Sequence, residues 1–321
     1  MSQSLDNTIA PSLSRGSIIV RRRLSAKKLR RFKPYLYLLP AVALLSIWMY
    51  RPLLYTFYLA FQKWSMVPGT SPVFVGFDNF EHLFHNKSFI DSIGNTIFYT
   101  VGLLPFSILI PMILAVVTDR MESKSKNFYR AMFFIPMILA PVSVSAIWRW
   151  LFHPSNGLVN YLLVKLHLIK EPIAYFSDPS FAKWIILLIT GWKMIGFSTI
   201  MFSAALTGIN REYYEAASQD GAGSFRQFVH ITIPLLSPMI IFMLTMSILF
   251  SSQWTFAYID MLTTGGPYGS STNIYYEMYR FAFSSLNVGL SSAAALLFFV
   301  VFGVIALGLN MLSRKFAFYD N

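Results

Sequence analysis

A polar stretch between two long apolar segments decides the fold of this chain. It runs from Asn210 to Pro238 and reads NREYYEAASQDGAGSFRQFVHITIPLLSP. Asn210 is a favourable N-cap, and residues 211–219 follow it with just over two turns of predicted helix, with Glu212 near the positive end of the helix dipole. Gly221 ends this helix, because glycine adopts the left-handed backbone that costs other residues about 1 kcal/mol or more. The loop is therefore expected to contain a helix that stops at a glycine turn.

The second half of the same stretch carries its own start signal. Ser224 followed by Gln227 is a capping-box pattern, which predicts a second short helix through Phe225 and Phe228. Pro234 then marks the approach to the next apolar segment. A loop folded as helix, turn and helix is expected to contact another protein.

The composition on either side of this loop requires a membrane. Of 321 residues, 55% are hydrophobic and only 12% are charged, whereas charged residues make up roughly a quarter of soluble domains. This excludes a soluble cytoplasmic enzyme and predicts an all-α polytopic membrane protein with six transmembrane helices. The absence of cysteine excludes disulfides, thiolate metal sites and iron–sulfur clusters. The predicted spans are residues 35–61, 93–118, 131–152, 182–206, 236–258 and 289–312.

The positive charge is concentrated where it orients a membrane protein. Residues 1–33 hold nine of the 26 Lys and Arg, which predicts a basic cytoplasmic tail that faces membrane lipids and no nucleic acid. With the N-terminus inside, the cytoplasmic stretches collect seventeen of these bases and the outer stretches collect six. This positive-inside bias predicts that both termini are cytoplasmic and that residues 65–90, 155–180 and 262–286 are external.

The external segments contain two amphipathic patterns, at residues 76–90 and 158–168, that predict short helices at the membrane interface. His82 and His85 lie three residues apart, as a metal-binding pair would, but no third ligand lies nearby. A surface pair is the favoured interpretation, and no metal site is expected. His230 is expected at an interface or in solvent.

Four prolines lie inside predicted spans and indicate kinked helices, because each removes a backbone hydrogen bond that neighbouring helices or water must replace. They are Pro105, Pro111, Pro136 and Pro141.

The loop also resembles a known motif. Glu215-Ala216-Ala217, followed after three residues by Gly221 and after nine more by Ile231, with Ile233-Pro234 closing the pattern, resembles the EAA loop of binding-protein-dependent ABC importer permeases. Asn210 stands where that family usually has proline. Further matches suggest the carbohydrate class typified by maltose and glycerol-3-phosphate importers, and the resemblance covers residues 35 to about 318. These matches are Asp220-Gly221-Ala222, Tyr37-Leu38-Leu39-Pro40, the segment Phe74 to Phe80, and the segment Leu262 to Pro267.

The resemblance implies an ABC importer permease fold in the cytoplasmic (inner) membrane of a bacterium. Residues 34–318 would form the permease domain, with the EAA loop at 207–238 and a short C-terminal end at 319–321. The chain would import a saccharide as a heterodimer with a second permease, served by two ATPase subunits and an extracytoplasmic solute-binding protein. ATP and Mg would bind to the ATPases, so this chain is expected to hold no cofactor and to be no enzyme. No G-x-x-x-x-G-K-[ST] phosphate loop occurs in the sequence.

Two groups of residues are assigned roles by this resemblance. The first would contact the ATPase: Glu212, Glu215, Ala216, Ala217, Asp220 and Gly221. The second would line the solute pathway in the fourth and fifth spans, where aromatic faces suit sugar rings and polar groups suit hydroxyls. Packing of the helix bundle is an equally open interpretation for each of these residues alone. They are Trp192, Lys193, Ser252, Gln253 and Trp254, together with the neighbouring Ser251.

Lys193 is the most informative of these residues. It lies about 16 Å along a helix that starts near Ala182, close to the middle of a hydrocarbon core about 30 Å thick. No acidic residue is found at mid-span. Lys193 must therefore face water, backbone carbonyls, an acid on the partner permease, or the solute itself. An acidic solute, such as a uronate oligosaccharide or a sugar phosphate, and a neutral oligosaccharide both stay open. Arg51 and Arg149 lie nearer the outer edge and are expected to reach the surface.

Two other classes of membrane protein fit this sequence less well. A secondary transporter or channel of small polar solutes would place acids or proton-relay histidines inside the membrane, which this sequence does not. A membrane-embedded enzyme would need a convergent nucleophile and base, or metal ligands.

Overall fold

The computed structural model describes residues 34–316. The predicted basic tail at 1–33 and the C-terminal end at 319–321 lie outside the described residues. The chain divides after Thr56 into two compact units. Residues 34–56, in the first unit, belong to a candidate span, Pro34–Leu59, which contains the π-helical turn η1 (Ser46–Tyr50) and continues as α2 (Arg51–Leu59).

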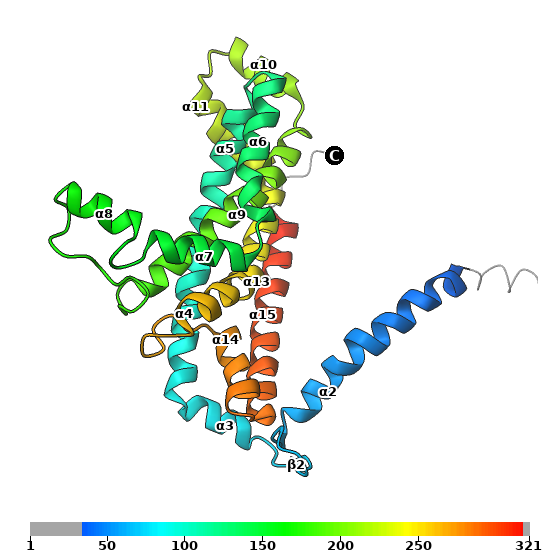
Figure 1. Ribbon diagram of the computed structural model, residues 1–321. Coiled ribbons are helices and arrows are strands. Elements are labelled where there is room, and N and C mark those ends of the chain that lie inside the picture. Colours follow the sequence, from blue (N-terminus) through cyan, green and yellow to red (C-terminus); the bar gives the residue numbers. More distant parts are fainter. Residues whose placement is uncertain (1–33, 317–321) are drawn as a thin grey trace, which may run out of the picture. The chain divides into compact units, whose positions relative to one another are not determined.

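The second unit is a helical bundle with one small hairpin (Figure 1). The hairpin pairs β1 (Gln62–Lys63) antiparallel to β2 (Val73–Phe74). The helices, with π-helical turns written η, are α3 (Asp78–His85), α4 (Lys87–Leu104), η2 (Pro105–Leu109), α5 (Ile110–Asp119), α6 (Ser123–Ile138), α7 (Pro141–Leu151), α8 (Leu158–Lys165), α9 (Ala182–Leu206), α10 (Arg211–Gln219), α11 (Ser224–Gln227), η3 (Phe228–Thr232), α12 (Ile233–Leu235), α13 (Ser237–Tyr258), η4 (Ile259–Thr263), α14 (Ile274–Tyr279), η5 (Arg280–Ser284) and α15 (Val288–Phe316).

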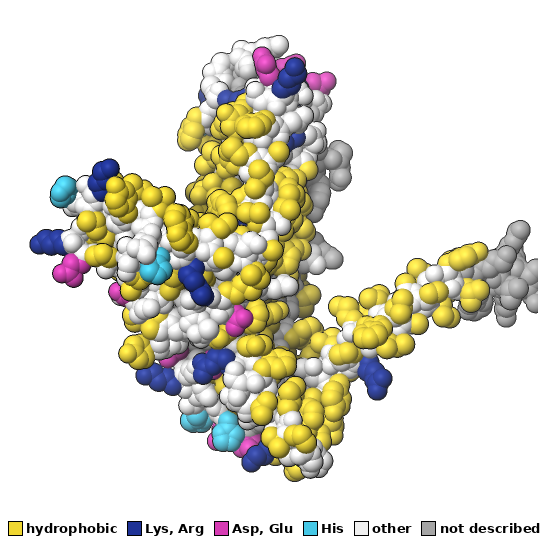
Figure 2. Space-filling model, in the orientation of Figure 1, with side chains coloured by type: hydrophobic (Ala, Val, Ile, Leu, Met, Phe, Trp, Pro, Cys, Tyr) yellow, Lys and Arg dark blue, Asp and Glu magenta, His cyan; other side chains and the backbone are white. Residues whose placement is uncertain are grey.

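Each predicted span has a counterpart in the described part of the chain. Five helices are long and apolar enough to cross a membrane, and a bent pair of helices makes a sixth. In Figure 2, charged side chains lie around α10 at one end of this unit, near α8, and from there down to α3 at the other end. Hydrophobic side chains cover much of the stretch between α10 and α7. Both predicted interfacial helices are also present, as α3 and α8.

The third span is not the continuous helix predicted for residues 131–152. The structure begins it earlier, as α6, and breaks it between Ile138 and Pro141, where α7 departs at 94°. Leu139 and Ala140 have extended backbones, with ψ of 132° and 138°. Pro141 explains the break, because the residue before a proline is disfavoured in the helical conformation and proline suits the first position of a new helix.

The second span also differs from the prediction. It begins at Lys87 instead of residue 93, because the Asn86 side chain accepts a hydrogen bond from the Phe89 backbone N–H and caps α4 at that point. Phe89 and Ile90 therefore belong to this span and not to the interfacial helix, which ends at His85. The span continues through η2, which begins at Pro105.

Helix α9 occupies the centre of the second unit. About two thirds (67%) of its most apolar stretch is buried, against 17–28% in the other intact spans of this unit. Small residues allow this central position. A β-carbon at Gly191 would lie 2.6 Å from the Phe106 ring, and one at Gly196 would collide with the carbonyl oxygen of Phe133 in α6. The backbones of α9 and α6 therefore meet directly at Gly196.

We predict that Gly196→Ala destabilises the protein by about 1–3 kcal/mol, because the added methyl group must push α6 away from α9. A reduced melting temperature of the detergent-purified protein would show this. Gly94→Ala is the matched control, since nothing lies within 4 Å of a β-carbon at Gly94 in α4. Equal melting temperatures for the two variants would contradict the close approach.

Candidate functional site

The loop between α9 and α13 folds as predicted in its first half. The Asn210 side chain accepts a hydrogen bond from the Glu212 backbone N–H (3.1 Å) and caps α10. Gly221 has φ +78°, in the left-handed region. The N–H of Ala222 bonds to the carbonyl of Ala217 (2.9 Å), and that of Gly221 bonds to Ser218 (3.1 Å). These two bonds form a Schellman motif, which satisfies the last carbonyls of the helix.

The capping box predicted at Ser224 is wrong. Gly223 is the N-cap of α11, and no side chain caps this helix. Gln227 has a different role, because its Nε2 donates to the Ser218 Oγ (2.8 Å) and to the Ala222 carbonyl (3.0 Å). It therefore ties α11 to the end of α10 and fixes the angle between them. The sequence pattern identified an important glutamine but not its partners.

One face of this loop is open to solvent. No side chain of α10 is buried, and Phe225 at the start of α11 is 80% exposed. The predicted contact residues Glu212, Glu215 and Ala216 are all exposed. In Figure 1 this helix pair lies at the end of the bundle where α5 ends and α6 begins.

A polar groove of about 790 Å³ separates the loop from the α5–α6 connection. Tyr214 and Glu215 line one side of it, and Asp119, Glu122 and Lys126 line the other. Lys126 pairs with Asp119 at 2.5 Å. The α6 helix therefore starts beside the loop at 207–238.

A second pocket lies along α9 and α13, at the break between α6 and α7. It has a volume of about 270 Å³. Three of the residues predicted for the pathway, Lys193, Gln253 and Trp254, meet there. The other lining residues are Met137, Pro141, Thr190, Ala257 and Tyr258.

Lys193 makes a specific contact in this pocket. Its Nζ donates to the carbonyl oxygen of Leu139 at 2.8 Å, and the residue is only 8% exposed. None of the ion pairs found between residues 34 and 316 includes Lys193. The sequence left several possible neighbours for the Lys193 ammonium, and the structure shows that it bonds to a backbone carbonyl. Leu139 is the C-cap of α6, where a helix leaves its last carbonyls without partners inside the helix.

The other predicted pathway residues do not line this pocket. Trp192 turns toward a hydrophobic cluster and packs edge-on against Trp148. Ser252 is fully buried on the opposite side of α13, where its carbonyl accepts from the Asn273 side chain. Ser251 is likewise buried, and its hydroxyl lies 2.8 Å from that of Thr100. Their place in the helix turn explains the difference, since residues one apart face different directions.

One residue of this pocket was missed by the sequence analysis. Tyr258 lines it and is 2% exposed, and its hydroxyl has no hydrogen-bond partner within the described residues. Its position four residues after Trp254 was the available signal. Arg149 is exposed, and its guanidinium donates to the carbonyl of Met261 in η4.

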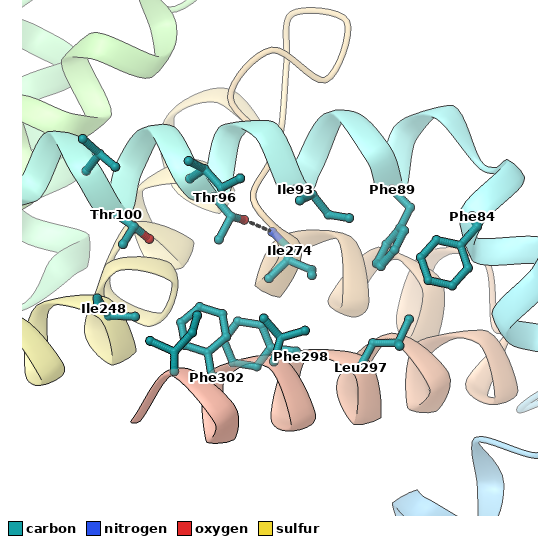
Figure 3. A pocket seen from close by; sticks show the side chains of 14 residues that line it. Phe84, Phe89, Ile93, Thr96, Thr100, Ile248, Ile274, Leu297, Phe298 and Phe302 are labelled. Carbon is teal, nitrogen blue, oxygen red and sulfur yellow. Dashed lines mark hydrogen bonds between the residues drawn. The ribbon is translucent and has the colours of Figure 1, made fainter. Parts of the chain in front are cut away.

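An apolar pocket of the second unit is unsuitable for a polar solute. Figure 3 shows it between α4, α13, α14 and α15, with Phe89, Phe298 and Phe302 among its walls. Its volume is about 380 Å³. Its hydroxyl groups are already engaged, because Thr96 accepts from the Ile274 N–H (2.9 Å) and Thr100 pairs with Ser251. A saccharide would lose its hydrogen bonds to water there without replacement.

The histidines of α3 make local contacts. His82 lies 3.6 Å from the Asp78 carboxylate, and the His85 ring lies 2.9 Å from the Glu81 carbonyl. Within residues 34–316, no three His, Asp or Glu side chains group as metal ligands would. The His230 ring lies on the exposed side of the loop, 3.0 Å from the Arg226 carbonyl.

The family of binding-protein-dependent transport system inner membrane components matches residues 73–316, which include the loop and both pockets. The chain belongs to this family. The permease is similar to the sn-glycerol-3-phosphate transport system permease protein UgpA of Pectobacterium atrosepticum, at 30% identity over 88% of this chain and 94% of that protein. Because the chain belongs to this family, it is an importer permease and not a secondary transporter or channel.

Solved structures support the same fold. The permease matches a chain of a bacterial ABC transporter involved in the import of the acidic polysaccharide alginate, with a TM-score of 0.80 and 28% identity over 91% of this chain and 99% of that chain. It also matches a chain of the alginate transporter in complex with an alginate pentasaccharide-bound periplasmic protein, with a TM-score of 0.79 and 28% identity over 91% and 98% of the two chains.

We predict that Gly221→Val loosens the turn of the permease by about 1–2 kcal/mol, because a branched residue is strained at positive φ. Trypsin cleavage at the nearby Arg226 in the detergent-purified chain should become faster. Gly221→Asn is the control, since asparagine tolerates this conformation. Equal cleavage rates for the two variants would contradict the left-handed turn.

Proposed function

We propose that this permease is one of two membrane subunits of an ATP-driven importer that moves a saccharide across the bacterial cytoplasmic membrane. A second permease, two ATP-binding cassette subunits and an extracytoplasmic solute-binding protein complete the complex. ATP and Mg bind to the ATPase subunits, and this chain holds no cofactor and hydrolyses nothing.

The pocket at the α6–α7 break carries this proposal. It combines the aromatic side chain of Trp254, the exposed amide of Gln253 and the buried hydroxyl of Tyr258 beside the Lys193 ammonium. Sugar rings pack on aromatic faces, and their hydroxyl groups exchange hydrogen bonds with amides and phenols. Saccharide import agrees with the solved transporter named for alginate import, while the relative named for sn-glycerol-3-phosphate transport points to a phosphorylated polyol.

The loop at 207–238 is the proposed contact with an ATPase subunit. Glu212 and Glu215 lie three residues apart on exposed turns of α10 and suit a basic group on the partner. Ala216 and Ala217 leave room for a close approach, while Asp220 and Gly221 set the turn. ATP-driven closure of the ATPases then reaches the bundle through this rigid helix pair, as in other rigid-body transitions.

The orientation of the chain is part of the proposal. Both termini and the loop at 207–238 face the cytoplasm, and the α3 end faces the solute-binding protein. The distribution of Lys and Arg supports this orientation. The alginate transporter, solved with a periplasmic protein, supports a partner on that side.

The function is tested by reconstituting the chain with its partners in proteoliposomes. We expect saccharide uptake that requires ATP and the binding protein and that survives an uncoupler. The isolated chain should neither hydrolyse ATP nor transport. Uptake that collapses with the proton gradient, or ATPase activity in the pure chain, would contradict the proposal.

The orientation is tested with single cysteines, because the chain has no native cysteine. In intact cells, a membrane-impermeant maleimide should label Ser88→Cys at the start of α4 and should leave Gln219→Cys at the end of α10 unlabelled. In inside-out vesicles the pattern should reverse. Labelling of Ser88→Cys only from the cytoplasmic side would overturn the topology.

A further inference from the structure

The contact between Lys193 and Leu139 joins the pocket to the broken span. Helices α6 and α9 run antiparallel, with Phe133 of α6 against Gly196 and Leu139 against Lys193. Gly196 and Lys193 lie one turn apart on the same face of α9. Lys193 therefore holds the end of α6 at the point where the chain turns into α7.

A second cation holds the far end of α7. Arg149 in its last turn donates to the Met261 carbonyl of η4. A contact between a cation and a neutral backbone carbonyl thus lies just before α7, at Leu139, and another lies in its last turn, at Arg149. Contacts of this kind are exchangeable, because an acidic oxygen adds the Coulomb attraction of a full negative charge to the hydrogen bond that a neutral carbonyl offers.

The pocket places its occupant beside this junction. Met137 lies before the break and Pro141 after it, and both line the pocket with Lys193 and Gln253. An acidic group that enters there meets an ammonium with no carboxylate partner among residues 34–316. The ammonium has three donors, so it can turn from the carbonyl to the new oxygen atoms.

We propose that Lys193 is a solute-responsive latch for an acidic saccharide, which rests on the function proposed above. A carboxylate or phosphate of the solute takes the Lys193 ammonium from the Leu139 carbonyl, and a solute hydroxyl or water replaces it there. The end of α6 is then released from α9. Lys193 is both the residue that selects acidic solutes and a positioning residue for the break.

Helix α6 connects the Lys193–Leu139 contact to the groove beside the loop at 207–238. It ends at the latch and begins at Ser123, beside the groove that Glu122 and Lys126 share with Glu215 of the loop. Its 16 residues span about 24 Å as a continuous helix. A two-state change at Leu139 therefore biases the position of the loop that is proposed to contact the ATPase.

The test uses the full complex with its cognate binding protein and measures ATPase stimulation by matched solutes. The probes are alginate oligosaccharides, oligogalacturonate and sn-glycerol-3-phosphate, each beside its carboxyl-reduced or dephosphorylated counterpart. The two acidic classes show whether the group is a carboxylate or a phosphate. In Lys193→Gln we expect the KM for an acidic probe to rise about tenfold or more, as when a charge-assisted hydrogen bond is lost. The response to its neutral counterpart should not change, and Lys193→Arg should restore the acidic response.

The matched control is Lys183→Gln, which removes a lysine from the first turns of the same helix. It should leave both responses unchanged. A merely structural role of Lys193 would lower acidic and neutral responses together. Equal responses of the native complex and Lys193→Gln to acidic probes, or stimulation of the native complex by neutral probes alone, would overturn the latch and leave the importer intact. Failure of every saccharide and of ATP-driven uptake would instead overturn the proposed function.

A distance measurement in the native complex tests the latch even if the Lys193→Gln variant fails to assemble. Spin labels at Ile138 and Ile147, both exposed, report the angle between α6 and α7 in the native complex. An acidic probe delivered by the binding protein should shift their distance distribution, and its neutral counterpart should not. An unchanged distribution with a stimulating acidic probe would contradict the latch.

Discussion

The structure depends on how one backbone carbonyl is satisfied inside an apolar helical bundle. A helix break inside an apolar bundle leaves backbone polar groups that neither apolar side chains nor lipid can satisfy, so the protein must supply their partners. At the break between α6 and α7 the Lys193 ammonium bonds to the Leu139 carbonyl. The charged lysine and the orphan carbonyl thus satisfy each other, and Gly196 brings their helices close enough.

Through this arrangement, two packed helices, α6 and α9, join the pocket at the α6–α7 break to the loop at 207–238. Helix α9 carries Lys193 at its middle and leads directly into the loop that begins beyond Leu206. Helix α6 runs beside it from the groove near that loop to the pocket. A change in either site therefore acts on the same pair of packed helices. Coupling of this kind needs only a pair of alternative contacts at one end and a rigid helix between the ends.

The sequence was sufficient to predict features that depend on residues close together in the chain. Asn210 and Gly221 mark the bounds of α10 through an N-cap and a left-handed turn, and apolar length alone predicted a counterpart for each span. The sequence was insufficient to predict contacts between residues that lie far apart in the chain. Prolines 136 and 141 predict kinks alike, yet Pro136 is accommodated inside α6 and Pro141 breaks the span. Gln227 showed a capping pattern but bonds across the turn. A backbone carbonyl such as that of Leu139 has no sequence signature, so Lys193 could be assigned several environments and no single one.

The most direct measurement is a structure of the assembled complex, by cryo-electron microscopy, during turnover with an acidic saccharide. The account predicts solute density between Lys193, Gln253 and Trp254, with the ammonium within hydrogen-bond distance of an acidic group and withdrawn from Leu139. Saccharide density elsewhere in the bundle, with Lys193 still bonded to the Leu139 carbonyl, would contradict it.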